Sequence, residues 1–154
     1  MASVFIEDPA YATAKPVQGF GFNGIVYHAD GYLLVNHQAL GKLLKVDLNG
    51  RSISEVALSA PIPDADGMVL VDPNTLGVVK NGVTGGKKEI VRLVSKDGWK
   101  NAIETGSANV GDVTPTTATL IGTTPYVIDS RAIELFDGKG PRSGTFVIRK
   151  AQFN

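Results

Sequence analysis

The stretch Asp66-Gly67-Met68-Val69-Leu70 places a polar residue and a glycine directly before an apolar run. The same order occurs at Asn23-Gly24-Ile25-Val26-Tyr27 and, more loosely, at Thr116-Thr117-Ala118-Thr119-Leu120. These starts lie 43 and 50 residues apart, a spacing typical of four-stranded propeller blades. One such unit cannot bury its apolar face alone, and three leave a ring open. The sequence therefore predicts three four-stranded propeller blades, which form half of a closed ring.

Turn signals divide the chain into short strands. Many of the 18 glycines stand in Asp-Gly, Asn-Gly and Gly-Gly pairs between runs rich in Val, Ile, Leu and Tyr. Charged and apolar residues alternate at 42–47 and 89–94, as in half-buried strands, and no long segment keeps a helical period. The sequence predicts an all-β protein with strands at 25–28, 32–36, 42–47, 53–58, 68–71, 76–80, 89–94, 99–104, 118–121, 125–129, 132–136 and 145–150.

The domain prediction follows from the repeat. Residues 1–18 form an N-terminal lead-in segment, and residues 19–154 form a three-blade half-propeller with blades at approximately 19–60, 61–108 and 109–154. A generic β-sandwich is the structural alternative, but it does not account for the repeat.

Composition excludes several classes of function. Fifteen basic residues balance fifteen acidic ones, so no charge excess favours nucleic acid or an anionic membrane. The absence of cysteine excludes disulfides, thiolate nucleophiles and zinc–thiolate sites. The first residues lack a basic segment followed by a long apolar run, and later apolar runs are too short to cross a bilayer. We expect a soluble protein, cytoplasmic rather than secreted.

Two of the strand starts resemble a known family. Asn23-Gly24-Ile25, followed one blade later by Ala65-Asp66-Gly67-Met68, is similar to the arrangement in the SMP-30/gluconolactonase (NHL-like) family of six-bladed propellers. The chain resembles the C-terminal halves of that family over roughly residues 19–137, with Val35, Val79 and Val127 in the second strands. The resemblance implies a metal-dependent hydrolase of sugar lactones and related esters.

The resemblance also implies metal ligands. In the family, an Asn and an Asp at these places ligate a divalent metal on the channel axis, which makes Asn23 and Asp66 the candidate ligands. Their oxygen donors suit Ca²⁺, with Mg²⁺ second. A family Glu ligand from the first blade has no counterpart here. Alternatively, Asn23 and Asp66 only shape turns before glycine.

Strand direction adds candidate site residues at the end of the units where the first strands begin, which we call the mouth. The antiparallel second strands should return their C-terminal ends to the end where the first strands begin, and loops on one face often carry function. Besides Asp66, the candidate catalytic residues are Asp129 and His37; the candidate substrate-binding residues are Asn36, Lys80, Asn81 and Ser130. Alternatively, His37 is a polar loop residue, and Lys80 and Asp129 form a structural pair.

The open edges of three blades predict a partner. The simplest closure is a homodimer with two-fold symmetry; a separate complementary half-propeller, or excision of the chain from a longer protein, is the alternative. The leading functional expectation is a lactonase-like hydrolase with a small-molecule ligand. The alternative is a non-catalytic binding or assembly module formed by dimerisation of half-propellers.

Overall fold

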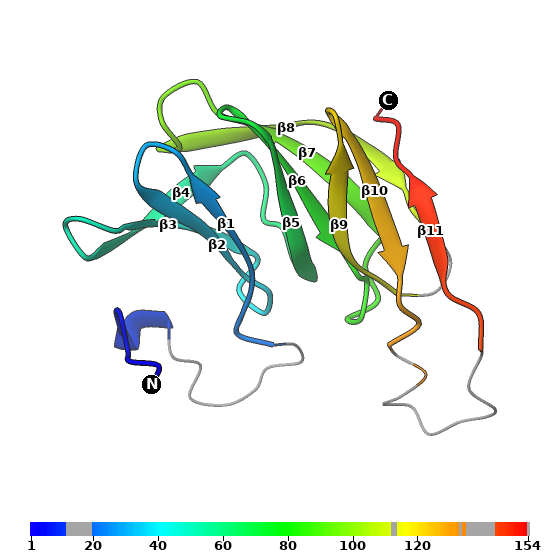
Figure 1. Ribbon diagram of the computed structural model, residues 1–154, viewed down its shortest axis with the longest axis horizontal. Coiled ribbons are helices and arrows are strands. Elements are labelled where there is room, and N and C mark those ends of the chain that lie inside the picture. The colour runs from blue at the N-terminus through cyan, green and yellow to red at the C-terminus, as the bar shows by residue number, and fades with distance from the viewer. Residues whose placement is uncertain (12–19, 112–113, 133, 135–143, 154) are drawn as a thin grey trace.

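The computed structural model describes residues 1–11, 20–111, 114–132, 134 and 144–153. Figure 1 shows a structure built of strands, so the all-β prediction is confirmed. Among these residues, no helix has the length and hydropathy needed to cross a membrane. The elements are η1 (Pro9–Tyr11), β1 (Phe22–His28), β2 (Tyr32–His37), β3 (Lys42–Asp47), β4 (Ser52–Leu58), β5 (Ala65–Asp72), β6 (Thr75–Lys80), β7 (Glu89–Val94), β8 (Asn101–Asn109), β9 (Pro115–Ile121), β10 (Thr124–Asp129) and β11 (Val147–Lys150).

Two antiparallel meanders form one eight-stranded sheet in the order β1-β2-β3-β4-β8-β7-β6-β5. A short parallel pairing of β4 with β8, at Ala57↔Asn101 and Leu58↔Ala102, joins the meanders. The edge strands β1 and β5 lie side by side, so the sheet is nearly closed (Figure 1). A separate three-stranded sheet has the order β11-β10-β9, and β9 lies beside β5.

We name the meander β1–β4 unit 1, the meander β5–β8 unit 2 and the sheet β9–β11 unit 3. The units pack face to face in chain order. One core lies between units 1 and 2 and includes Leu34, Leu43, Leu76, Val78 and Trp99. A second core lies between units 2 and 3 and includes Val79, Ile90, Ala108, Val127 and Ala151. Unit 2 is therefore buried on both faces.

Each unit has two faces, which we call back and front. The front face of a unit points toward the following unit and the back face toward the preceding one. In β2 the side chains alternate: Leu34 contributes to the core with unit 2 and is on the front, whereas Leu33 and Val35 are on the back. Partners across the ladder share a face, which places Ile25 and Tyr27 on the back of unit 1.

The strands at 42–47 and 89–94 have the predicted bounds. The prediction of a strand at 99–104 is wrong at its start. Trp99 has a left-handed φ of 62° and its N–H donates to Ser95 Oγ at 2.9 Å, so it ends a turn and β8 begins at Asn101. Because that turn precedes it, β8 begins and ends later in the chain than predicted.

The third unit also differs from its prediction. The expected strand at 132–136 lies largely outside the described residues. The expected last strand begins at Val147 and pairs directly with β10, through Ile128↔Ile148 and its neighbours, so it takes the third place in the unit and not the fourth.

The three units repeat one backbone hydrogen bond at the mouth. The residue after the second strand donates its N–H to the carbonyl of the residue two positions before the repeated polar residue. The pairs are Gln38 N to Gly21 O at 3.0 Å, Asn81 N to Asp64 O at 3.0 Å and Ser130 N to Thr114 O at 3.1 Å. Side chains after β2, β6 and β10 are thereby brought to one end of the molecule.

Candidate functional site at the mouth

The first strands of the units start at the same end, low in Figure 1, and approach closely there. A Cβ at Gly24 would lie 2.2 Å from the carbonyl oxygen of Asp66, and one at Gly67 would lie 2.5 Å from Thr117 Oγ1. Glycine is therefore required for this spacing at both positions. The contact brings Asn23 beside Asp66, although 43 residues separate them in the sequence.

Four side chains form a hydrogen-bonded ring across units 1 and 2, which we call the amide ring. Asn23 Nδ2 donates to Gln38 Oε1 at 3.0 Å, Gln38 Nε2 to Asn81 Oδ1 at 3.4 Å, and Asn81 Nδ2 to Asp66 Oδ2 at 2.9 Å. The Asn23 side chain also lies close to the Asp66 carboxylate, where it helps to lower the pKa of that group, and so completes the ring. Gln38 and Asn81 are buried, whereas Asn23 is exposed. Three candidates from the sequence thus meet here.

Gln38 is the member that the sequence did not single out. It directly follows β2 and is 1% exposed. A glutamine after a strand carries no distinctive pattern. The equivalence with Asn81, which follows β6 in the next unit, is the signal that could have identified it.

Burial raises the pKa of the Asp66 carboxyl above its ordinary value, and the hydrogen bonds from Asn81 and Asn23 offset part of that rise. A carboxyl with this environment holds a proton more readily than an exposed one. Such a group is suited to accept a proton from water, provided that a substrate lies within hydrogen-bond reach.

Asn36 lies beside the amide ring, but its side chain is hydrogen-bonded to backbone groups. Its Nδ2 donates to the Asp66 carbonyl at 2.5 Å, and its Oδ1 accepts from Gly24 N at 3.2 Å. It is fully buried. These contacts make it a clamp between the first strands of units 1 and 2.

Lys80 pairs with Glu89, at 3.0 Å between Nζ and Oε1. The two side chains are 15% and 11% exposed and come from adjacent strands in direct register. The sequence left open a structural pair of Lys80 with Asp129. In the structure, the ladder between β6 and β7 places Glu89 beside Lys80 as its partner. A partly buried pair of this kind holds Lys80 in place at the mouth.

Asp129 and Ser130 end β10 in a local network. The Asp129 carboxylate accepts from Thr114 N at 2.9 Å and from Arg131 N at 3.3 Å, while Ser130 Oγ donates to Thr114 O at 3.4 Å. Asp129 is 2% exposed. These contacts attach the end of β10 to the residues before β9.

His37 is fully buried at the end of β2. Its Nδ1 accepts from Leu40 N at 3.3 Å, and its Nε2 lies 3.2 Å from Tyr11 O. Phe22 packs edge-on against the ring. Both nitrogens therefore face backbone groups, as expected for a histidine that shapes a turn.

The atoms of the amide ring that could ligate a metal are amide and carboxylate oxygens, which are the ligands that Ca²⁺ or Mg²⁺ prefers. It contains one carboxylate. Within residues 1–11, 20–111, 114–132, 134 and 144–153, no three His, Asp or Glu side chains gather closely enough to hold a metal ion. The donors thus fit a hard cation in kind.

Searches of protein-family models and of curated proteins found no match to this chain.

Proposed function

We propose that this chain is a half-propeller assembly module. Units 1, 2 and 3 act as blades, a second copy closes the six-bladed ring, and the closed ring presents the amide ring to a small polar ligand. The observation that carries the proposal is that the stack of units ends in two open faces of complementary type, each with exposed apolar side chains.

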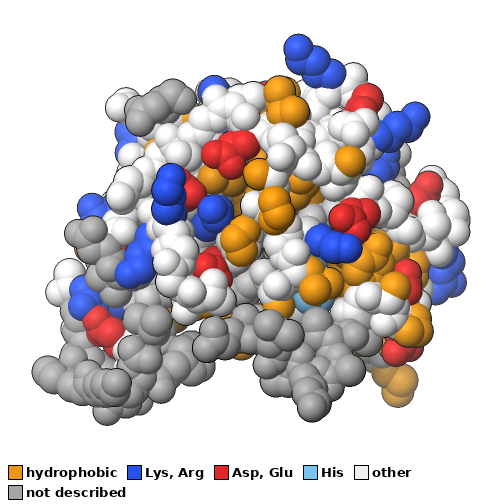
Figure 2. Space-filling view, turned by 180° about the vertical axis from the view of Figure 1, so that it is seen from behind, with side chains coloured by type: hydrophobic (Ala, Val, Ile, Leu, Met, Phe, Trp, Pro, Cys, Tyr) orange, Lys and Arg blue, Asp and Glu red, His pale blue; other side chains and the backbone are white. Residues whose placement is uncertain are grey.

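The back face of unit 1 is one of these open faces. Ile25 and Tyr27 are each 59% exposed on it. The back faces at the interfaces within the chain are covered: on the back of unit 2, Met68, at the position equivalent to Ile25, is 7% exposed, and on the back of unit 3, Val127 of the second strand is 1% exposed. In Figure 2, where unit 1 lies on the right, hydrophobic side chains reach the surface in this part of the molecule.

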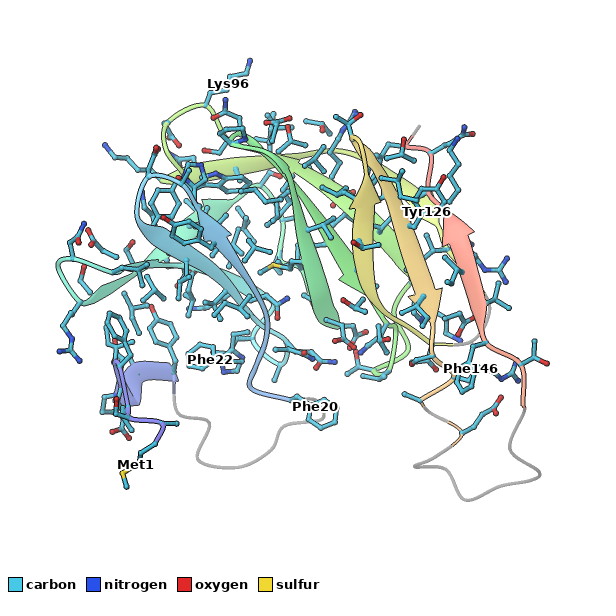
Figure 3. The ribbon with its side chains drawn as sticks, viewed as in Figure 1. Met1, Phe20, Phe22, Lys96, Tyr126 and Phe146 are labelled. Atoms are coloured by element: carbon cyan, nitrogen blue, oxygen red, sulfur yellow. The ribbon has the colours of Figure 1, made fainter. Side chains whose placement is uncertain are left out.

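The front face of unit 3 is the other open face. Ile148 is 68% and Ile121 is 65% exposed, and Tyr126 shares the face. Figure 3 shows Tyr126 at the opposite end of the molecule from Met1. A back face meets a front face at both interfaces within the chain, so the open back face of one copy suits the open front face of another.

The burial of unit 2 on both faces supports blades over the β-sandwich. A two-layer sandwich has one core, with each sheet turning one face to solvent. Here β6 and β7 are buried almost throughout, and separate cores lie on their two sides. Three stacked layers of this kind favour the radial arrangement of a propeller.

Sedimentation equilibrium of three variants tests the closure. Ile148→Glu and Ile25→Glu place a charge on the two open faces and should each weaken dimerisation at least tenfold. The matched control is Ile103→Glu, because Ile103 is 53% exposed on β8 and lies on neither open face. A folded wild-type protein that stays monomeric at hundreds of micromolar, or equal weakening by the control, would contradict the proposal.

A metal-dependent lactone hydrolase is the second candidate. The contact of Asn23 with Asp66 favours it, since the SMP-30/gluconolactonase resemblance implies these two residues as axial ligands. A bound divalent cation would polarise a lactone carbonyl. Asn23 and Asp66 would hold it together with donors from the second copy, and Asp66 is also the candidate base for water. One copy alone should bind the cation weakly.

Calorimetric titration with Ca²⁺ and with Mg²⁺ tests this candidate on dimeric protein. Binding should be lost in Asp66→Asn and kept in Asp30→Asn, whose carboxylate is 76% exposed on a turn. Hydrolysis of sugar lactones is then measured with the cation and with a chelator. No binding at millimolar cation by a proven dimer would exclude the hydrolase and leave the assembly module in place.

A further inference from the structure

Residues 1–11 lie against the open back face of unit 1, and we call them the strap. With that face they enclose a pocket of about 640 Å³. Its lining is predominantly apolar and comes from Val4, Phe5 and Ile6 on the strap side and from Val35, Leu44 and Ile53 on the sheet side. The strap therefore covers the surface that a second copy needs in the proposed closure.

Few contacts hold the strap. Arg51 donates a hydrogen bond to the Phe5 carbonyl, and its guanidinium lies 4.8 Å from the centre of the Phe5 ring. Near the other end, Tyr11 O lies 3.2 Å from His37 Nε2, and the Tyr11 and Phe22 rings are 6.2 Å apart. Figure 3 shows Phe22 beside this segment. With two attachment points among the described residues, the strap is easy to displace.

The strap is an incomplete cover. Phe5 remains 43% exposed and Val4 76% exposed, while Ile25 and Tyr27, on the back face of unit 1, are still more than half exposed. The centre of the back face of unit 1 is buried at Leu44, so the difference from unit 2 lies at the edge strand: Met68 on β5 is 7% exposed, whereas the equivalent Ile25 on β1 is 59% exposed. A front face from a second copy would thus bury more apolar surface than the strap does.

We propose that the strap is a displaceable competitor of the second copy: it occupies the back face of unit 1 in the monomer and leaves when the front face of another unit 3 docks. This inference rests on the proposed closure of the ring by a second copy. The occupant of the face in the assembled state is the surface formed by Tyr126, Ile128 and Ile148 of that copy.

Two substitutions in the full chain test the competition. Arg51→Ala removes both contacts of the strap with Arg51, and Phe5→Asp makes the strap less apolar. Each should increase the association constant of the dimer about fivefold, because less interaction is lost when the strap leaves. The matched control is Arg92→Ala. Arg92 makes the same type of contact, 5.3 Å from the centre of the Phe153 ring, away from both open faces.

Hydrogen exchange gives a second measurement. Its result would be the same in monomer and dimer if the strap stayed in place. In the monomer, Ala10 N and Tyr11 N donate to Asp8. Both amides should exchange faster in the dimer, whereas the ladder of β2 with β3 should stay protected.

The outcomes separate the two proposals. Tighter association of Arg51→Ala and Phe5→Asp, with faster exchange at Ala10 and Tyr11 in the dimer, supports the strap as a competitor. Unchanged or weaker association in a protein that dimerises through its open faces overturns the strap proposal and leaves the closure intact. Absence of association in the wild type and in both folded strap variants overturns the closure itself, and the strap proposal with it.

Discussion

The backbone of Gly24 rests against the carbonyl of Asp66, so closely that a Cβ at residue 24 would lie 2.2 Å from that oxygen. This contact fixes how near the first strands of units 1 and 2 approach each other. The amide ring depends on that distance, because Asn23 directly precedes Gly24 and Asp66 provides the contacted carbonyl.

Gly24→Ala should destabilise the protein by about 3 kcal/mol, since the new methyl group meets backbone that cannot move independently of β5. Urea unfolding followed by circular dichroism measures the change. Gly50→Ala is the matched control, because the nearest atom to a Cβ there is Asp47 Cγ at 3.5 Å, an ordinary contact. Equal midpoints for the two variants would show that the strands separate without cost.

Thr117→Gly should tighten the proposed dimer. Thr117 occupies, in unit 3, the position that glycine holds in units 1 and 2 as Gly24 and Gly67. Glycine allows the close approach of the next unit at those positions, so the Thr117 side chain should keep a docking unit further away. We expect a severalfold gain in the association constant by sedimentation. Thr119→Gly, on the same strand and face, carries a similar backbone cost and should give no gain.

The stability of wild type relative to Asp66→Asn should fall as the pH rises from about 3.5 to about 7. The folded-state pKa of Asp66 is raised by burial, so the folded protein binds this proton more tightly than the unfolded chain does. The resulting stabilisation is fully present below the unfolded-state pKa and is lost as the pH rises through the folded-state pKa. Urea unfolding of both proteins across this range measures the difference. A difference independent of pH would contradict the raised pKa.

Asp97→Ala should lower the Tm at pH 7, and the loss should shrink as the pH falls toward 2. Hydrogen bonds from the side chain and N–H of Asn101 lower the pKa of the Asp97 carboxyl to about 2. The carboxylate therefore contributes stability above its unfolded-state pKa and loses it as the pH falls through the folded-state value. Thermal unfolding at several pH values checks this. Lys96→Ala, at the exposed tip of the same turn (Figure 3), should leave the Tm unchanged.

The amide ring was only partly predictable. Asn23 and Asp66 were candidates because of the family resemblance, and Asn81 was one because the second strand returns to the end where the first strand begins. Gln38 did not stand out, yet its buried amide connects Asn23 to Asn81. Lys80 was expected at the mouth, but its partner depends on the register of β6 with β7, which the residue pattern of either strand leaves open.

By itself, the sequence determined most strands of units 1 and 2 and their order along the chain. Side chains alternate along a strand with a period of two residues, so a run such as Lys42–Asp47 is recognisable from its own residues. It also determined the repeat, since Asn23-Gly24 and Asp66-Gly67 mark equivalent starts.

The tertiary structure alone decided the parallel pairing of β4 with β8, the turn that delays β8 to Asn101 and the position of the strap. These features depend on contacts between residues far apart in the chain, or on side-chain hydrogen bonds such as those to Asp97, which compete with strand pairing. The local alternation of apolar and polar residues does not indicate them. The same reason explains why Asn23 and Asp66 were candidates from the sequence but became neighbours only through the packing of unit 1 on unit 2.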